Sequence, residues 1–127
     1  MKIKYDQQVD AAYLTLETAE IVDSEEVQPN VVFDYDECDR VIGIELLSVK
    51  RNIPNLLELP KLLSSITKTH RNFDFPAFFN FLVKTADLNL IENEKARQRI
   101  KIEKISLEKS PANLRSPFPV VIAPSHP

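Results

Sequence analysis

Three carboxylates in the first half of the chain have the residue types and the spacing of a metal-binding loop. With Asp34 as the first position, Asp36 is the third and Glu45 the twelfth, which are ligand positions of a calcium-binding loop. The fifth position is Cys38, a poor ligand for a hard cation, and the sixth, which needs glycine for a sharp turn, is Asp39. The flanking segments also alternate like strands, whereas a calcium loop of this kind lies between helices. We therefore expect no metal and no cofactor, and a weak metal-dependent enzyme on these carboxylates remains an alternative.

The same stretch fits an antiparallel β-hairpin better. If Cys38 and Asp39 form a two-residue loop, apolar residues before the loop face apolar residues after it on one side of the sheet. The predicted pairs are Tyr35 with Ile42, Phe33 with Ile44 and Val31 with Leu46. The opposite, wetter face pairs Asp34 with Gly43 and also carries Asp36 and Glu45, and Asp34, Asp36 and Glu45 form our candidate partner surface. The loop would hold Cys38 at a positive φ, which is expected to cost some stability.

The remaining strands and helices can be placed from periodicity. Residues 2–5 and 12–16 alternate apolar and polar side chains as half-buried strands do, and residues 20–27 are a weaker strand candidate. From residue 51 the pattern becomes helical: Pro54 suits the first turn of a helix, Pro60 either kinks that helix or starts a second one, and Asp74 suits an N-cap.

The last third of the chain is less regular. Residues 94–109 are rich in helix formers, but their apolar side chains do not line one helical face. The final seventeen residues contain five prolines and are expected to form an extended, mobile tail.

Phenylalanines are concentrated between residues 73 and 81. Most of such a stripe belongs in a core, but five rings are many for one short helix, so a partner or dimer surface is also expected. The candidate interaction helix is defined by Phe75, Phe78, Phe79 and Phe81.

Composition narrows the classes of function. The 127 residues can bury one modest core, and no stretch has the length of a membrane span or the pattern of a secretory signal. Cys38 is the single cysteine, so an intrachain disulfide is excluded, and Gly43 is the single glycine, so glycine-rich phosphate loops are excluded. A cytoplasmic location fits these features.

Charge is divided unevenly along the chain. Residues 1–50 carry twelve acidic and four basic side chains, a net of −8, and residues 51–127 carry seven acidic and twelve basic, a net of +5. Such asymmetry is typical of partners of opposite sign, of halves that dock on each other, or simply of two differently solvated surfaces. The acidic half favours a basic protein partner over nucleic acid, and the basic stretch from Lys95 to Lys104 lacks the aromatic side chains that stack on bases.

No constellation of nucleophile, base and orienting acid is visible. His70 lies in a linker and His126 in the tail, and neither is next to a plausible catalytic Ser or Cys. Negative neighbours disfavour a thiolate at Cys38. We therefore expect that the protein is not an enzyme.

The series of short motifs in the first fifty residues resembles one family. These motifs are Tyr5-Asp6, Asp10-Ala11-Ala12-Tyr13-Leu14, Ser24 with Glu26-Val27 and Pro29, Asp34-Tyr35-Asp36, and Val41-Ile42-Gly43-Ile44-Glu45-Leu46. They are similar to the small bacterial and cyanobacterial family called domain of unknown function 2283, over residues 1–50. The sequence departs from the family pattern at Asn30, where a glycine is usual, and at Cys38-Asp39, where Asp-Gly is usual. The resemblance transfers no activity and no catalytic residue, and genes of some members lie beside small toxin-like proteins, which implies an antitoxin-like partner role as an alternative.

Together these observations predict an α+β protein of a bacterial cytoplasm. A small antiparallel sheet of three to five strands (residues 1–50) precedes a helical extension (residues 51–110) that partly covers one face, and a proline-rich tail (residues 111–127) follows. The favoured function is a non-enzymatic protein-interaction module with a basic protein partner and no membrane association, and a homodimer is a further candidate assembly.

Overall fold

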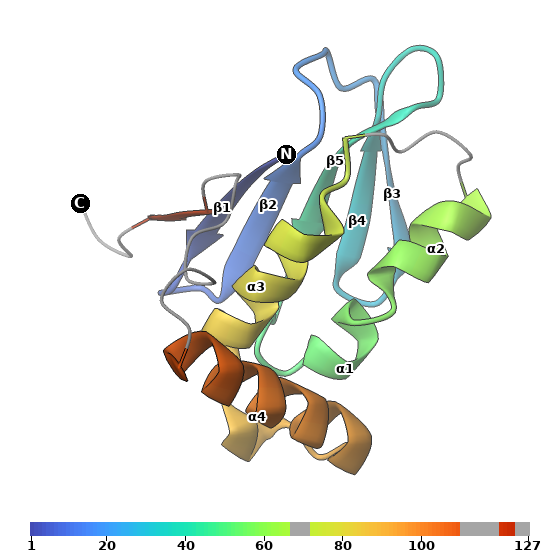
Figure 1. Cartoon of the computed structure of the whole chain (residues 1–127). Coiled ribbons are helices and arrows are strands. Elements are labelled where there is room, and N and C mark those ends of the chain that lie inside the picture. Colours follow the sequence, from blue (N-terminus) through green and yellow to red (C-terminus); the bar gives the residue numbers. More distant parts are fainter. Residues whose placement is uncertain (67–71, 110–119, 124–127) are drawn as a thin grey trace.

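A computed structural model describes residues 1–66, 72–109 and 120–123. It contains one mixed sheet with helices packed on one of its faces, so the predicted α+β class is confirmed (Figure 1). The strands are β1 (Lys2–Asp6), β2 (Ala11–Thr15), β3 (Asp23–Gln28), β4 (Val31–Tyr35), β5 (Val41–Leu46) and β6 (Val120–Ala123). The helices are α1 (Ile53–Leu56), α2 (Leu59–Ile66), α3 (Phe75–Thr85), the short 3-10 helix η1 (Leu88–Leu90) and α4 (Glu94–Lys109).

The strand order across the sheet is β3-β4-β5-β2-β1-β6. The first five strands pair antiparallel, as predicted, whereas β6 pairs parallel with β1. The predicted tail therefore contains a short strand at Val120–Ala123, and the rest of that prediction lies outside the described residues.

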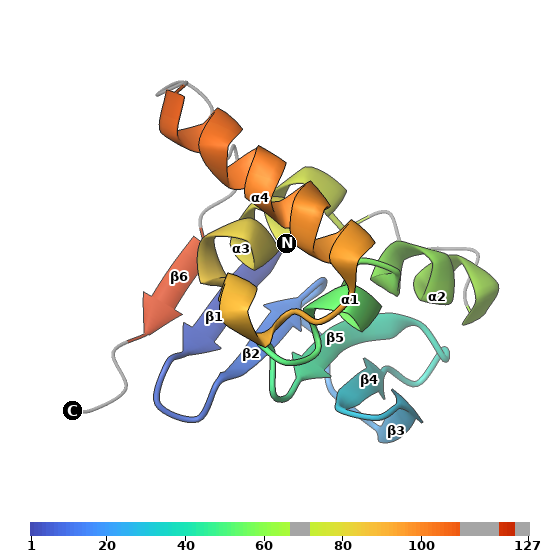
Figure 2. The ribbon, with the colours of Figure 1, turned by 90° about the horizontal axis from the view of Figure 1, so that it is seen from below.

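The helices lie on one side of the sheet and leave its other side open (Figure 2). Alternation along the strands sends one set of apolar side chains toward the helices, which is why Ile3, Leu14, Phe33 and Ile44 are almost fully buried. Helix α3 contributes Phe78 and Phe81 to the same core, and Phe81 meets Tyr5 edge to face with ring centroids 5.4 Å apart. Sheet and helices thus share one continuous core.

The helix starts follow the sequence signals. Asp74 caps α3, since its carboxylate accepts the backbone N–H of Ala77 at 3.1 Å, and Pro76 lies in the first turn. In α4 the side chains of Ala96 and Ile100 face the core, whereas Ile102 and Ile105 are exposed. Two apolar directions on one helix explain why the sequence of α4 shows no single apolar face. Among the described helices, none has the length and apolar composition needed to cross a membrane.

The β4–β5 hairpin has the predicted register over most of its length, but its loop differs from the prediction. Phe33 is opposite Ile44 and Asp34 is opposite Gly43, as predicted, whereas Tyr35 is opposite Val41 because the register shifts by a bulge. The backbone N–H of Asp36 donates to the carbonyl of Arg40 at 3.0 Å, and Asp39 has a φ of 59°. This is a three-residue loop, a turn followed by one left-handed residue and a bulge.

The two-residue loop and the positive φ at Cys38 were therefore wrong predictions. A type I′ turn needs two residues at positive φ, whereas the observed loop needs one. With no glycine at the tip, the chain adopts the turn that places only Asp39, a residue type that tolerates the left-handed region, at positive φ. Asn30, at the departure from the family pattern, also has a left-handed φ of 69°, as its residue type allows.

Candidate functional site

Asp34 is the centre of a hydrogen-bond network on the open face of the sheet. Its Oδ2 accepts the hydroxyl of Tyr13 and its Oδ1 accepts the hydroxyl of Ser24, each at 2.6 Å. The three residues belong to β2, β3 and β4, so the network spans the sheet from β2 to β3. Asp34 is only 8% exposed, and both of its oxygens have a partner inside the protein.

The single glycine makes this network possible. Gly43 lies on β5, between the strands of Tyr13 and Asp34, and a β-carbon at Gly43 would overlap the Tyr13 hydroxyl and lie 2.6 Å from its Cζ. The absence of a side chain lets the phenol lie flat across β5. Burial, then the hydrogen bond to Asp34, raise the pKa of the Tyr13 phenol well above its usual value.

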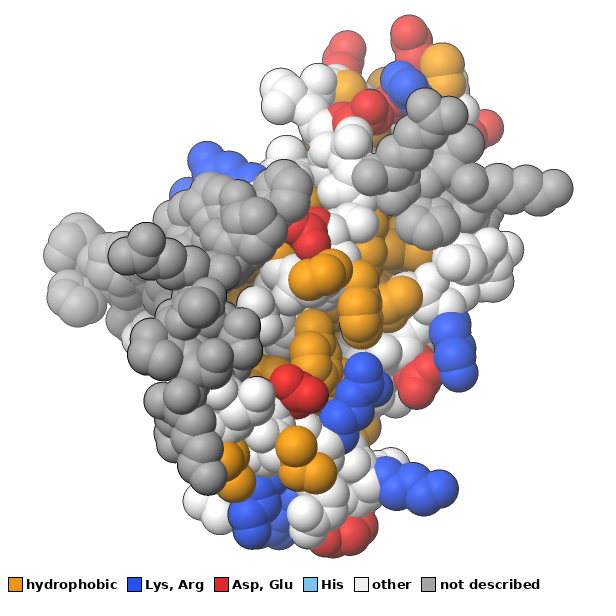
Figure 3. Space-filling view, in the orientation of Figure 1, with side chains coloured by type: hydrophobic (Ala, Val, Ile, Leu, Met, Phe, Trp, Pro, Cys, Tyr) orange, Lys and Arg blue, Asp and Glu red, His pale blue; other side chains and the backbone are white. Residues whose placement is uncertain are grey.

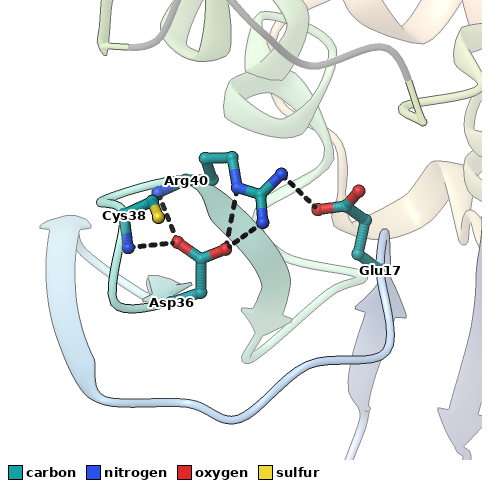
Figure 4. Close-up of polar contacts among 4 residues, drawn as sticks. All are labelled: Glu17, Asp36, Cys38 and Arg40. Carbon is teal, nitrogen blue, oxygen red and sulfur yellow. Dashed lines mark hydrogen bonds and ion pairs between the residues drawn. The ribbon is translucent and has the colours of Figure 1, made fainter.

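Asp36 holds the β4–β5 loop closed (Figure 4). Its Oδ1 accepts the backbone N–H groups of Cys38 at 2.9 Å and Arg40 at 3.0 Å, and its Oδ2 accepts the Arg40 guanidinium through Nε and through a terminal nitrogen, both at 2.8 Å. The Arg40 guanidinium also approaches Glu17 at 4.0 Å. The backbone N–H of Arg40 and the other donors outweigh burial and lower the pKa of the Asp36 carboxyl.

A second tyrosine–aspartate pair joins the sheet to the helical half. The hydroxyl of Tyr5 donates to Asp10 Oδ1 at 2.6 Å, and Asp10 Oδ2 accepts the backbone N–H of Lys50 at 3.0 Å. The carbonyl of Asp10 accepts the N–H of Val49 at 3.1 Å. These bonds fix the chain at the point where it leaves β5 and approaches α1.

Several residues of these networks also carry the family resemblance, namely Tyr5, Asp10, Tyr13, Ser24, Asp34, Asp36 and Gly43. Residues 2–50 match the family model described as protein of unknown function (DUF2283). The resemblance seen in the sequence is therefore confirmed for this segment. No curated protein and no solved structure matches the chain. Within the DUF2283 segment, Tyr5, Asp10, Tyr13, Asp34 and Gly43 all have a structural role in the contacts described above.

The predicted partner surface of Asp34, Asp36 and Glu45 is not one continuous acidic face. Asp34 and Asp36 are 8% and 4% exposed and are engaged internally, so only Glu45 presents its carboxylate to solvent. Within the described part of the chain, no three His, Cys, Asp or Glu side chains are grouped so that they could hold a metal ion. Sequence reasoning missed the roles of Tyr13 and Ser24, although the predicted pairing of Asp34 with the only glycine was a usable signal.

A different acidic surface lies at one end of the sheet. The β2–β3 connection and the β4–β5 loop meet there, and the N–H of Val22 donates to the carbonyl of Tyr35 at 2.9 Å (Figure 1). We call this surface the acidic end. It comprises Glu17, Glu20, Ile21, Val22, Asp23, Glu25, Asp36, Glu37, Asp39 and Arg40.

The acidic end combines carboxylates with exposed aliphatic side chains. Its seven carboxylates against one guanidinium leave a formal net charge of −6. Ile21 and Val22 are 50% and 55% exposed. Figure 3 shows Asp and Glu side chains gathered at the top of the view, where this end lies. Sequence reasoning missed this surface, although an apolar pair between Glu20 and Asp23 was visible.

Carboxylates of the acidic end line a hollow and surround the Tyr35 phenol. A hollow of about 170 Å³ is lined by Ala19, Glu20, Val22, Asp36, Glu37 and Arg40. Burial raises the pKa of the Tyr35 phenol, and the negative charges of Glu25, Asp23 and Asp39 raise it further. The hydroxyl of Tyr35 donates to Glu25 at 3.3 Å. Negative charges from β3 and from the β4–β5 loop thus act together on one phenol at this end of the sheet.

The candidate interaction helix is divided between core and surface. Phe78 and Phe81 are buried in the shared core, whereas Phe75 is 37% exposed and Phe79 is half-buried. Phe75 stacks on Phe79 with centroids 5.9 Å apart, and the Arg99 guanidinium lies 4.8 Å from the centroid of Phe79. A shallow hollow of about 310 Å³ adjoins these rings, lined by Leu57, Glu58, Pro60, Lys61, Phe75 and Arg99. Two of the four predicted rings are thus accessible.

Proposed function

We propose that the protein is a non-enzymatic interaction module that binds a basic protein through the acidic end of its sheet. The observation that carries this proposal is the grouping of seven carboxylates around two exposed aliphatic side chains, Ile21 and Val22, with Arg40 as the one cation. A cationic partner would gain from the field of the acidic end, and an apolar contact would add short-range affinity.

Both parts of this surface are needed under physiological conditions. Salt at about 0.15 M screens exposed charges beyond roughly 8 Å, so charge speeds association but holds a complex only at close contact. Burial of Ile21 and Val22 would supply part of that contact. A phosphate backbone would be repelled by the same carboxylates, which favours a protein over a nucleic acid.

The carboxylates available to a partner differ from those first predicted. Asp36 is committed to Arg40 and to the loop backbone, whereas Glu20, Glu37 and Asp39 are exposed and accept no hydrogen bond from the described residues. A variant that reverses Glu20 and Glu37 and neutralises Asp39 as asparagine, a residue type that tolerates the left-handed φ of this position, tests the surface with little strain on the fold.

The experiment compares the parent chain with the triple variant Glu20→Lys, Glu37→Lys and Asp39→Asn. A matched control, Glu58→Lys, Glu92→Lys and Glu94→Gln, makes the same change in net charge on exposed residues of the helical half. Proteins recovered with the parent chain from cells are identified, purified and titrated against all three chains by calorimetry at low and high salt.

The proposal expects a basic partner that loses about tenfold or more in affinity with the acidic-end variant and little with the control. High salt should weaken binding of the parent chain. An acidic partner, co-purifying RNA, or equal loss of affinity in both variants would contradict it. A small basic toxin among the recovered partners would identify the antitoxin-like case of the same function.

A further inference from the structure

The sheet ends in β6 on one side and in β3 on the other. At one end of the strand order, β1 is covered by β6. At the other end, β3 pairs only with β4, and no second strand among the described residues pairs with its outer side (Figure 2). Such an edge presents a row of backbone N–H and C=O groups that another extended chain can pair with.

The side chains of β3 decide which extended chain fits. Asp23, Ser24, Glu25 and Glu26 are all exposed. Because side chains alternate along a strand, Glu25 and Glu26 point to opposite faces of the sheet. Glu25 receives the hydroxyl of Tyr35, and Glu26 is opposite Val32 of β4. Both faces of the β3 edge are therefore negative.

This charge pattern selects against a second copy of the chain. Pairing two β3 strands would place carboxylates beside carboxylates, which is destabilising for directly opposed residues. An incoming strand with Lys or Arg on both of its faces would instead pair with carboxylates on both sides. The exposed Ile21 and Val22 lie immediately before β3 and could meet an apolar residue of the same segment.

We propose that an extended, cationic segment of the partner adds to β3 as a further strand of the sheet. This inference rests on the proposed function, because it specifies how the basic partner is held. Backbone hydrogen bonds to β3 would supply affinity, and the charges on Glu25 and Glu26 would supply selectivity.

The test uses a capped eight-residue peptide of Lys, Arg, Val and Thr and two N-methylated forms of it. One form is methylated on the odd-numbered amides and the other on the even-numbered amides. In a strand, alternate amides point to opposite edges, so only one methylation set can face β3. Binding to the full chain is measured by fluorescence anisotropy, and NMR chemical shifts locate the site.

Strand addition predicts that the unmodified peptide and one methylated form bind, and that the other form binds about tenfold or more weakly, because its inward hydrogen bonds are blocked. The NMR chemical-shift changes that the peptide causes should be largest in β3 and β4. The double variant Glu25→Lys with Glu26→Lys should bind the unmodified peptide about tenfold more weakly than the parent chain does. The double variant Glu92→Lys with Glu94→Lys, which makes the same change in net charge, should bind it with nearly unchanged affinity.

Equal binding by all three peptides would overturn strand addition while leaving charge-driven binding at the acidic end intact. No binding by any peptide, or shifts confined to another surface, would also overturn it. Concentration-dependent dimers of the free chain that are lost in Glu25→Lys with Glu26→Lys would overturn the argument against self-pairing. Failure of the proposed function is distinguished separately, since the acidic-end triple variant would then retain the natural partner.

Discussion

The hydroxyl of Tyr13 reaches across an intervening strand to donate a 2.6 Å hydrogen bond to Asp34. The residue beneath the ring is Gly43, where a β-carbon would collide with the phenol. Tyrosine, glycine and aspartate, widely separated in the sequence, therefore form one unit. This relationship explains why the chain places its single glycine within a strand, where glycine usually weakens the structure.

The first prediction concerns Gly43→Ala. The added methyl group displaces the Tyr13 ring and leaves buried Asp34 without one partner, so we expect a loss of about 1–3 kcal/mol in the free energy of unfolding. In a Tyr13→Val background the collision is absent, and Gly43→Ala should be neutral or stabilising by up to about 1 kcal/mol, because alanine is the better strand residue. Urea denaturation of the four chains measures both effects. The same loss in both backgrounds would contradict the proposed unit.

The second prediction concerns how the free energy of unfolding declines at alkaline pH. Burial, together with hydrogen bonds to Asp10 and Asp34, raises the pKa of the Tyr5 and Tyr13 phenols above the usual value of 10.0. The unfolded chain releases these protons near pH 10 while the folded chain retains them, so their contribution to stability is complete below pH 10 and declines above it. Each phenol can add a slope of up to about 1.4 kcal/mol per pH unit. Urea denaturation from pH 8 to 11 should show a shallower decline for Tyr13→Phe than for the parent chain.

Much of the fold could be predicted from the sequence because local pattern and tertiary packing agree there. Alternation fixed the pairing of Phe33 with Ile44, and Asp74 with Pro76 located the start of α3. The loop tip could not be predicted, because a two-residue and a three-residue loop differ by one bulge and leave the same pairs below it. The strand β6 was equally hidden, since a short parallel pairing with β1 depends on long-range contact and not on local pattern.

The candidate site was less predictable than the fold. Asp34 and Asp36 were expected to share a solvent-exposed face. The sequence contained no direct sign that Tyr13 and Ser24 cover Asp34 and donate hydrogen bonds to it, or that Arg40 binds Asp36. Burial of a carboxylate depends on its partners, which lie on other strands. The carboxylates that stay exposed, Glu20, Glu37 and Asp39, are those without such a partner on another strand among the described residues.

The loop tip supplies a third prediction. Asp39 has a left-handed φ of 59°, a conformation in which a side chain is strained, so Asp39→Gly should stabilise the protein by about 0.5–1 kcal/mol relative to Asp39→Ala. Both variants remove the same charge, and their difference therefore isolates the backbone. Cys38→Asn should have no comparable benefit, because Cys38 is not at a positive φ. Thermal melting that ranks the alanine variant above the glycine variant would contradict this loop geometry.

A fourth prediction concerns the stability of the protein at acidic pH. The donors around Asp36, first the backbone N–H of Arg40, lower the pKa of its carboxyl in the folded state. A lowered folded pKa contributes stability that is present above the unfolded value of about 3.9 and is lost as pH falls through the folded value. Asp36→Asn should therefore flatten the decline in stability below about pH 4, whereas Glu37→Gln, an exposed neighbour in the same loop, should leave it unchanged. Fluorescence-monitored denaturation between pH 2 and 5 provides the measurement.

The last prediction concerns the connection between the sheet and the helical half. Asp10 has a left-handed φ of 54°, and its carboxylate accepts the Tyr5 hydroxyl and the Lys50 backbone N–H. Asp10→Ala removes both bonds and leaves alanine in the strained conformation, so we expect a loss of about 3 kcal/mol. Asp10→Gly loses the same bonds without the strain and should be about 1 kcal/mol less damaging, and Asp10→Asn should be milder still, because it keeps an acceptor oxygen and tolerates the conformation.

Hydrogen exchange separates a local effect of these Asp10 variants from a global one. The amide of Lys50 donates to the Asp10 carboxylate and should lose protection first, and the amide of Val49, which donates to the Asp10 carbonyl, should follow as the junction loosens. Amides in the centre of β4 and β5 should change only as far as the whole protein is destabilised. If Val49 and Lys50 kept their protection in Asp10→Ala, the junction would be held by the packing of α1 against the sheet. The tyrosine–aspartate pair would then stabilise only the β1–β2 turn.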